Sequence, residues 1–152
     1  MVKEISFFAF HLFNAFQMKI NFVLSACILL FTTSCSLKVE EPQAKQLVEN
    51  LLNDLKNENF SNLDQYYAAS FNESEPAEKK IEKYNRLKEV IGSIASYEFV
   101  SAIEKYDDYS NIKFLELLYS VKGKKLTVKE TFRVMNDAGK LKITYQNIEN
   151  LK

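Results

Sequence analysis

A glutamate interrupts an apolar alternation near the end of the chain. In LTVKETFRV, residues 126–134, every second side chain falls on the same face of a predicted strand, and Glu130 is one of them. The apolar members of this set are Leu126, Val128, Phe132 and Val134. Because desolvation in an apolar pocket raises the pKa of a carboxyl group, Glu130 is a candidate general base or acid.

Glu116 is a second and less clear candidate of the same kind. It lies between Phe114 and Leu118 in FLELLYSV, a run that is apolar on both sides and in which we predict a β-bulge. The alternative for both glutamates is a side chain that faces solvent or forms an ion pair. The cations placed to pair with them are Lys113, Lys129 and Arg133. Because glutamate is seldom buried, we expect this alternative.

Tyrosines are the remaining candidate pocket residues. A tyrosine combines an apolar ring with a hydroxyl group, so several of them could line a ligand pocket, although packing in the core or at its rim is their more common role. We select Tyr66, Tyr67, Tyr119 and Tyr145 from a larger set that includes Tyr84 and Tyr97.

Histidine and a second cysteine occur only near the start of the chain. His11 and Cys27 both precede Cys35, so a domain whose Cys35 is modified has no free thiol and no imidazole. This excludes Cys–His pairs, Ser–His triads and His- or Cys-based zinc sites. Asp107 and Asp108 share a predicted turn that lacks the glycine and the spaced oxygen ligands of a calcium loop. We therefore expect no metal and no cofactor.

Cys35 follows a segment with the layout of an export signal. MKINFVLSACILLFTTSC, residues 18–35, has a basic start at Lys19, an apolar stretch, and small hydroxyl residues before the cysteine. The apolar run is shorter than the roughly 20 residues that cross a bilayer. An ordinary signal does not require a cysteine at the junction.

The segment resembles a bacterial lipoprotein signal, whose lipobox places small residues before an invariant cysteine. Ser34 fits this pattern, whereas Thr32 stands where leucine is usual. The resemblance implies cleavage between Ser34 and Cys35 and attachment of a diacylglyceryl group to the Cys35 thiol. Several acyl chains are needed because one chain gives only marginal, reversible anchoring.

The predicted signal divides the chain into four parts. Residues 1–17 are Phe-rich and precede the better-placed start at Met18, so we interpret them as a mis-annotated or discarded extension. The four parts are an extension (1–17), a lipoprotein signal peptide (18–34), the lipidated cysteine with a tether (35–42), and a single domain (43–152).

The 118 residues from Cys35 onward suffice for one domain with a core. Without Lys3, Lys19 and Glu4, the 20 basic and 20 acidic residues of the chain become 18 and 19. This balanced charge leaves no basic footprint for nucleic acid. We expect contact with the membrane to come from the lipid alone.

Helices are predicted first and strands last. The predicted helices are AKQLVENLLNDLKNEN (44–59), SNLDQYYAASF (61–71) and AEKKIEKYNRLKEVIG (77–92). Pro42 suits the first turn of the first helix, Ser61 with Asp64 is a candidate capping pair for the second, and Gly92 is a candidate C-cap for the third.

Beyond Gly92 the hydrophobic period changes to two. The predicted strands are ASYEFVSAIEKY (95–106), NIKFLELLYSV (111–121), LTVKETFRV (126–134) and KLKITYQNI (140–148). Turns with glycine, KGKK and NDAG, separate the last three strands. Short strands joined by such turns indicate an antiparallel meander, and the segregated order of elements indicates an α+β fold.

Three stretches resemble the small lipoprotein domains of unknown function in the nuclear transport factor 2-like, or cystatin-like, superfamily. They are QLVENLLNDLKNENFSNLDQYYAASF, LKEVIGSIASYEFVS and TFRVMNDAGKLKITYQNI. The resemblance runs from Pro42 to Ile148 and implies N-terminal helices packed on a curved antiparallel sheet around a conical cavity. Relatives with isomerase or dehydratase activity use Asp, Tyr and His in that cavity, and none of their motifs is matched here.

These observations predict a lipid-anchored cell-envelope domain that binds a small ligand or a protein partner without catalysis. The lipid on Cys35 would hold it at the outer membrane or on the outer face of the cytoplasmic membrane. One alternative is a small isomerase-, dehydratase- or hydrolase-like enzyme that uses a pocket carboxylate and a tyrosine. Another is a structural envelope subunit, since sheets of this fold often pair into homodimers.

Overall fold

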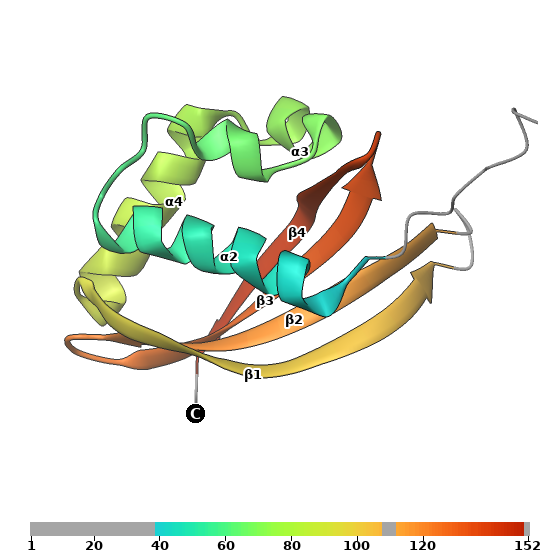
Figure 1. Cartoon of the computed structure of the whole chain (residues 1–152). Helices are drawn as coiled ribbons and strands as arrows, with labels where there is room; N and C mark the ends of the chain where they lie inside the picture. The colour runs from blue at the N-terminus through green and yellow to red at the C-terminus, as the bar shows by residue number, and fades with distance from the viewer. Residues whose placement is uncertain (1–38, 108–111, 151–152) are drawn as a thin grey trace, which may run out of the picture. The chain divides into compact units, whose positions relative to one another are not determined.

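The computed structural model describes residues 39–107 and 112–150, which belong to one compact unit. Helices come first and a four-stranded antiparallel sheet follows, as Figure 1 shows, so the α+β class is confirmed. The helical elements are α2 (Glu41–Lys56), the 3-10 helix η1 (Leu63–Tyr66), α3 (Ala69–Ser74) and α4 (Ala77–Ile91). The strands are β1 (Ile94–Asp107), β2 (Ile112–Gly123), β3 (Thr127–Asp137) and β4 (Lys140–Asn150).

The first helix forms because its apolar residues recur at helical spacing. The side chains of α2 that are buried against the sheet are Ala44, Val48, Leu51, Leu52 and Leu55. The helix begins at Glu41, so it extends into the segment predicted as tether, and Pro42 lies in its first turn as expected. Fixing φ by a proline is favourable in the first turn, where its missing N–H has no helical partner anyway.

The segment after α2 departs from the sequence prediction. Instead of one helix over residues 61–71, the chain forms η1 and then α3. Ser61 caps neither of them, because its hydroxyl donates to Asn59 Oδ1 at 2.7 Å and Asn62 precedes η1. A local side-chain partner two residues away thus replaces the predicted capping contact.

The end of α4 is closely joined to the sheet. Gly92 follows the helix with φ of 77°, a left-handed conformation that glycine adopts without a Cβ clash, so the C-cap prediction is confirmed. The Ile91 carbonyl accepts the Lys125 N–H at 2.7 Å. Gly123 lies against this carbonyl so closely that an added Cβ would be 2.2 Å from the oxygen. The helix end and the β2–β3 turn therefore form one junction.

The sheet is a meander in the order β1-β2-β3-β4 with every neighbouring pair antiparallel, as predicted. The bulge predicted within FLELLYSV is wrong, because β2 pairs with β3 in continuous register from Leu115 to Lys122. The irregularities lie elsewhere: between Ile94 and Ser96, between Phe99 and Ser101, and opposite Arg133–Val134 of β3, where β4 carries Thr144 as an extra residue.

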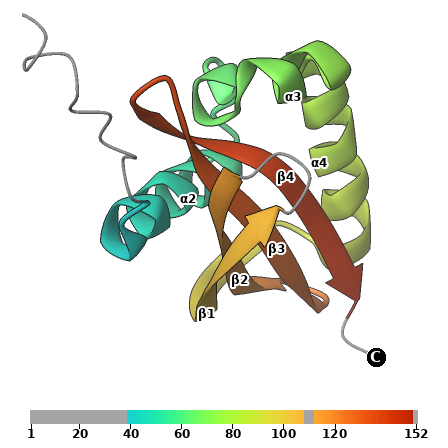
Figure 2. The same cartoon turned by 90° about the vertical axis from the view of Figure 1, so that its right-hand side faces the viewer.

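All helices lie along one face of the sheet, as Figures 1 and 2 show from two directions. We call this the inner face, and the opposite one the outer face. The fully buried strand residues of the inner face are Leu117, Tyr119, Val121, Val128, Phe132, Val134 and Ile143. Figure 1 shows the strands curving around the helices, so the core lies between the helices and the concave side of the sheet.

Within the described ranges, no helix is both long and apolar enough to cross a bilayer. The predicted signal peptide, the start at Met18, the cleavage between Ser34 and Cys35 and lipidation at Cys35 all concern residues that lie outside those ranges. Asp108 of the acidic turn lies outside them too.

Candidate functional site

Glu130 lies on the inner face and is buried. Only 1% of its surface is exposed, and its cross-strand neighbours are Tyr119 of β2 and Ile148 of β4. The expectation that Glu130 faces solvent or forms an ion pair is wrong, because β3 runs through this position without an extra residue and the inward alternation continues past it. The apolar pattern around it thus outweighs the usual preference of glutamate for the surface.

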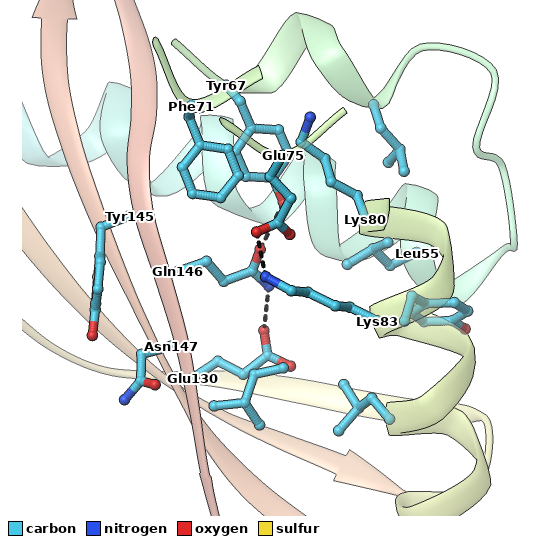
Figure 3. A pocket seen from close by; sticks show the side chains of 14 residues that line it. Leu55, Tyr67, Phe71, Glu75, Lys80, Lys83, Glu130, Tyr145, Gln146 and Asn147 are labelled. Atoms are coloured by element: carbon cyan, nitrogen blue, oxygen red, sulfur yellow. Dashed lines mark hydrogen bonds and ion pairs between the residues drawn. The ribbon is translucent and has the colours of Figure 1, made fainter. Parts of the chain in front are cut away.

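A pocket of about 400 Å³ lies between the inner face and the helices, and Glu130 is part of its wall. Figure 3 shows the lining residues. Its apolar lining comes from Leu55, Leu63, Phe71, Leu87 and Ile148. The polar and charged side chains that line it include Tyr67, Tyr84, Gln146, Lys80, Lys83 and Glu75. An apolar cavity of this size with a few polar groups has the usual character of a small-molecule site.

Three side chains form a hydrogen-bonded chain along one wall of the pocket. The Tyr67 hydroxyl donates to Gln146 Oε1 at 2.7 Å, and Gln146 Nε2 donates to Glu130 Oε2 at 3.1 Å (Figure 3). The other carboxyl oxygen, Glu130 Oε1, is buried and has no hydrogen-bond partner among the described residues. Buried polar atoms nearly always have a partner, so this oxygen is a feature that needs an explanation.

Gln146 reaches the pocket because of the irregularity in β4. In plain alternation Ile143 and Tyr145 would share a face, but the extra residue Thr144 reverses the order beyond it. Gln146 therefore faces inward, opposite Phe132, while Tyr145 pairs with Arg133, whose guanidinium carbon is 4.6 Å from the centre of the Tyr145 ring. Figure 3 shows Tyr145 on the opposite side of β4 from Gln146.

Tyr67 is held beside β4 by a short bridge. It pairs with Ile143, and the next residue, Ala68, donates its N–H to the Ile143 carbonyl at 2.9 Å. The Tyr67 ring stacks on Phe71 with ring centres 4.7 Å apart. Burial, followed by the nearby charge of Glu130, raises the pKa of Tyr67 well above its usual value, so its hydroxyl remains a donor.

The buried position sets the protonation of Glu130. Desolvation raises its pKa from 4.5 to about 7, and the hydrogen bond from Gln146 opposes this shift only in part. Near neutral pH the group therefore exchanges between a neutral acid and a carboxylate. Groups with such a pKa can transfer protons, and they can also bind a ligand in a proton-dependent way.

Both lysines in the lining have other partners. Lys80 is buried and donates to Asp64 Oδ1 and to Asn72 Oδ1, each at 2.7 Å, and its ammonium lies 5.0 Å from the centre of the Tyr67 ring. Lys83 forms an ion pair with Glu75. Among the described residues, then, the cations of this pocket are paired with acids other than Glu130.

Glu116 is on the outer face, away from the pocket. It forms ion pairs with Lys105 and with Arg133, whose Nε donates to Glu116 Oε2 at 3.1 Å. The hydrogen bond from Lys105 is the main cause that lowers the pKa of Glu116. The predicted pairing with Arg133 is thus confirmed for Glu116, whereas Lys113 pairs with Glu104.

The candidate tyrosines are only partly brought together. Tyr67 lines the pocket with its side chain. Tyr145 also belongs to the lining, but its ring points to the outer face of the sheet. Tyr66 instead donates to Asp54, and Tyr119 packs edge-on against Phe132 beside Glu130 without lining the pocket. The polar residue that the sequence reasoning missed is Gln146, whose inward position depends on a bulge with no local sequence signal.

No cluster of three or more His, Cys, Asp or Glu residues that could hold a metal occurs in the described part of the chain. The acids nearest the pocket are separated by their partners, since Asp64 and Glu75 bind lysines. The polar groups joined in one hydrogen-bonded chain at the site are the Glu130 carboxyl group, the Gln146 amide and the Tyr67 hydroxyl.

No protein-family model matches the sequence, and neither does any curated protein. Among solved structures, the chain is similar to Bd1075 of Bdellovibrio bacteriovorus, with a TM-score of 0.48 and 12% sequence identity. The match covers 71% of this chain and 39% of that one, so the chain spans about two fifths of the length of Bd1075. The function must accordingly be inferred from the geometry of the site itself.

Proposed function

We propose that this protein is a lipid-anchored cell-envelope domain that binds a small molecule in the pocket at Glu130 without transforming it. In this proposal the fold is of the nuclear transport factor 2-like type, and the lipid on Cys35 holds it at the outer membrane or at the outer face of the cytoplasmic membrane. Nucleic acid is not a partner, because the charge of the domain is balanced.

The observation that carries the proposal is the buried, unpartnered Oε1 of Glu130 in a pocket of about 400 Å³. A buried oxygen without a partner costs on the order of 1–3 kcal/mol, and more if the group is charged. A ligand that donates a hydrogen bond to this oxygen would remove that cost. The volume lies within the range that small-molecule sites occupy.

A second candidate function is proton-transfer catalysis, favoured by the pKa of about 7 at Glu130. General bases work best with a pKa near the operating pH. Against this candidate, the hydroxyl of Tyr67 already donates to Gln146, and both lysines in the lining are paired. The described residues thus offer few free donors to stabilise charge that develops on a substrate.

The pocket proposal is tested by protein-observed NMR with a library of small molecules. We expect binders to shift the amide signals of Glu130, Gln146 and Tyr67 together. A Leu87→Phe variant, which enlarges a side chain of the pocket lining, should weaken the same binders. A library in which every binder instead shifts residues outside the pocket would contradict the proposal.

The anchor is tested by labelling cells with a fatty-acid analogue. We expect label on the protein and none on a Cys35→Ala variant, because the thiol is the predicted attachment point. Equal label on both would remove the anchor from the proposal. If translation begins at Met18, Met18→Ala should abolish expression and Met1→Ala should not.

A further inference from the structure

The charge balance inside the pocket is incomplete when Glu130 is ionised. Lys80 is bound to Asp64, and Lys83 is bound to Glu75. Arg133 neighbours Glu130 along β3 but lies on the outer face, between Glu116 and Tyr145. The carboxylate of Glu130 therefore has no counter-ion among the described residues, although it is the most buried acid of the pocket.

The polar atoms of the lining that have no hydrogen-bond partner indicate which kind of ligand group can complement them. Gln146 uses Nε2 for Glu130 and Oε1 for Tyr67, so both ends of its amide are engaged. Glu130 Oε1 and the Tyr84 hydroxyl are buried in the lining without a partner among the described residues. A carboxylate oxygen can only accept, so the group that complements it must be a donor.

We infer that the pocket takes a small organic cation, a primary ammonium on a mainly apolar body, with the ammonium bound to Glu130 Oε1 and the body against the leucines and Phe71. This deepens the proposed function and depends on it. An ammonium supplies both the missing charge and the missing donor, and charge-assisted hydrogen bonds are about twice as strong as neutral ones. The Tyr84 hydroxyl is a second acceptor for the same group.

Binding of this cation is linked to release of the Glu130 proton. The titratable groups that face Glu130 from the packed elements are Tyr67, Tyr84, Tyr119, Glu75, Lys80 and Lys83. Burial raises the pKa of each of these tyrosines, each lysine is paired with an acid, and desolvation raises the pKa of Glu130 to about 7. Below that pH the ammonium must displace a proton, and its affinity falls.

The test uses three probes of nearly equal size: phenethylamine, phenethyl alcohol and phenylacetate. The full-length protein, purified in a non-ionic detergent, is titrated with each while the amide signals of Glu130 and Gln146 are followed. We expect the amine to bind at least about tenfold more tightly than the alcohol near pH 8, and phenylacetate to bind most weakly. The amine affinity should fall about tenfold between about pH 8 and pH 6, while that of the alcohol stays level.

Two variants provide matched controls. Glu130→Gln keeps the side-chain shape but removes the charge, and we expect it to abolish both the preference for the amine and its pH dependence. Glu116→Gln changes an acid of the adjacent strand on the outer face, away from the pocket, and we expect it to keep both. Partition of probes into detergent is the same for all three proteins, so it cancels from the comparison.

The outcomes separate this inference from the proposal beneath it. If the alcohol or phenylacetate binds in the pocket as tightly as the amine, the cation inference is overturned and the proposed ligand site stands. If the preference for the amine survives in Glu130→Gln, the inference is overturned as well. If none of the probes shifts the pocket signals, even at concentrations that saturate weak sites, the inference and the proposed pocket function both fail.

Discussion

Glu130 and Glu116 are both glutamates on adjacent strands, yet their surroundings shift their pKa values in opposite directions. Glu130 lies on the inner face of β3 with one amide donor, and burial raises its pKa to about 7. Glu116 lies on the outer face of β2 between Lys105 and Arg133, and these donors lower its pKa. Its side chain is 17% exposed, compared with 1% exposure for Glu130 as a whole.

The difference arises from strand register and from the available partners. In the β2–β3 pairing, Glu116 faces Arg133, whereas Glu130 faces Tyr119. An opposite charge directly across the strands stabilises a carboxylate, and an aromatic ring does not. The inner face of the sheet thus carries an acid without a counter-ion, Glu130, whereas the acid on the outer face, Glu116, is paired with cations beside it.

The largest effect is expected from removing packing that covers the inner face. Leu51 of α2 is fully buried, so Leu51→Ala should lower the free energy of unfolding by roughly 2–5 kcal/mol. Leu126 is 54% exposed, and Leu126→Ala is the matched control with an expected change below about 0.5 kcal/mol. Urea unfolding measures both. Equal losses would mean that the inner face is not the stabilising side.

The next effect concerns pH. The folded pKa of Glu130 lies above its unfolded value, so its neutral form stabilises the fold, and this stability is lost as pH rises towards about 7. We expect the free energy of unfolding to fall by roughly 2–3 kcal/mol from this group between about pH 5 and pH 8. Urea unfolding of Glu130→Gln should lack that loss.

An NMR titration of the Glu130 carboxyl provides the independent measurement. A midpoint near 4.5, the value of an unperturbed glutamate, would contradict the burial argument and remove the best residue of the enzyme candidate. Glu116→Gln is the control for the unfolding series, and we expect it to leave the loss between pH 5 and pH 8 unchanged.

A smaller effect is expected from breaking the hydrogen-bonded chain. Tyr67→Phe removes the donor to Gln146 and should cost about 1 kcal/mol in unfolding free energy. Tyr84→Phe removes a buried hydroxyl with no partner among the described residues, so stability should stay level or rise by up to about 1 kcal/mol. Thermal unfolding of the two variants side by side gives the comparison. A larger loss of stability in Tyr84→Phe than in Tyr67→Phe would mean that the Tyr84 hydroxyl, and not the Tyr67 hydroxyl, donates a stabilising hydrogen bond.

The smallest effect is expected on the outer face. Glu116→Gln breaks two partly exposed ion pairs, which together should contribute less than about 1 kcal/mol. Screening should reduce this contribution further at about 1 M salt. Urea unfolding at low and high salt measures this contribution. A large loss of unfolding free energy that salt does not change would mean that Glu116 stabilises the fold by more than partly exposed ion pairs.

Local patterns predicted most of the fold. The apolar spacing of α2, the glycine after α4 and the alternation along β3 each act within a few residues, and each is found in the structure. The same alternation placed Glu130 among apolar neighbours. The rarity of buried glutamates argued against taking this literally, and here the pattern was the better guide.

The rest of the site depends on contacts that sequence spacing does not encode. Gln146 faces the pocket only because Thr144 is an extra residue in β4, and the sequence predicted a bulge in β2 instead. Lys80 is buried because Asp64 and Asn72, from two other elements, converge on its ammonium. Such placements follow from packing between distant segments, so a single sequence gives no signal for them.

The junction of Ile91 with the β2–β3 turn has a consequence for the movement of the pocket wall. Gly123 and the Lys125 N–H fix the C-terminal end of α4 through backbone contacts, whereas its other end is held by the side chains of Lys80 and Lys83, so we expect any opening of the helix to begin at that other end. Amide protons at the junction should exchange with solvent on the timescale of global unfolding, and those of the short α3 much sooner. Ligands would then enter and leave the pocket at the end where α3 meets α4. The rate at which that end opens would set the residence time of the bound ligand.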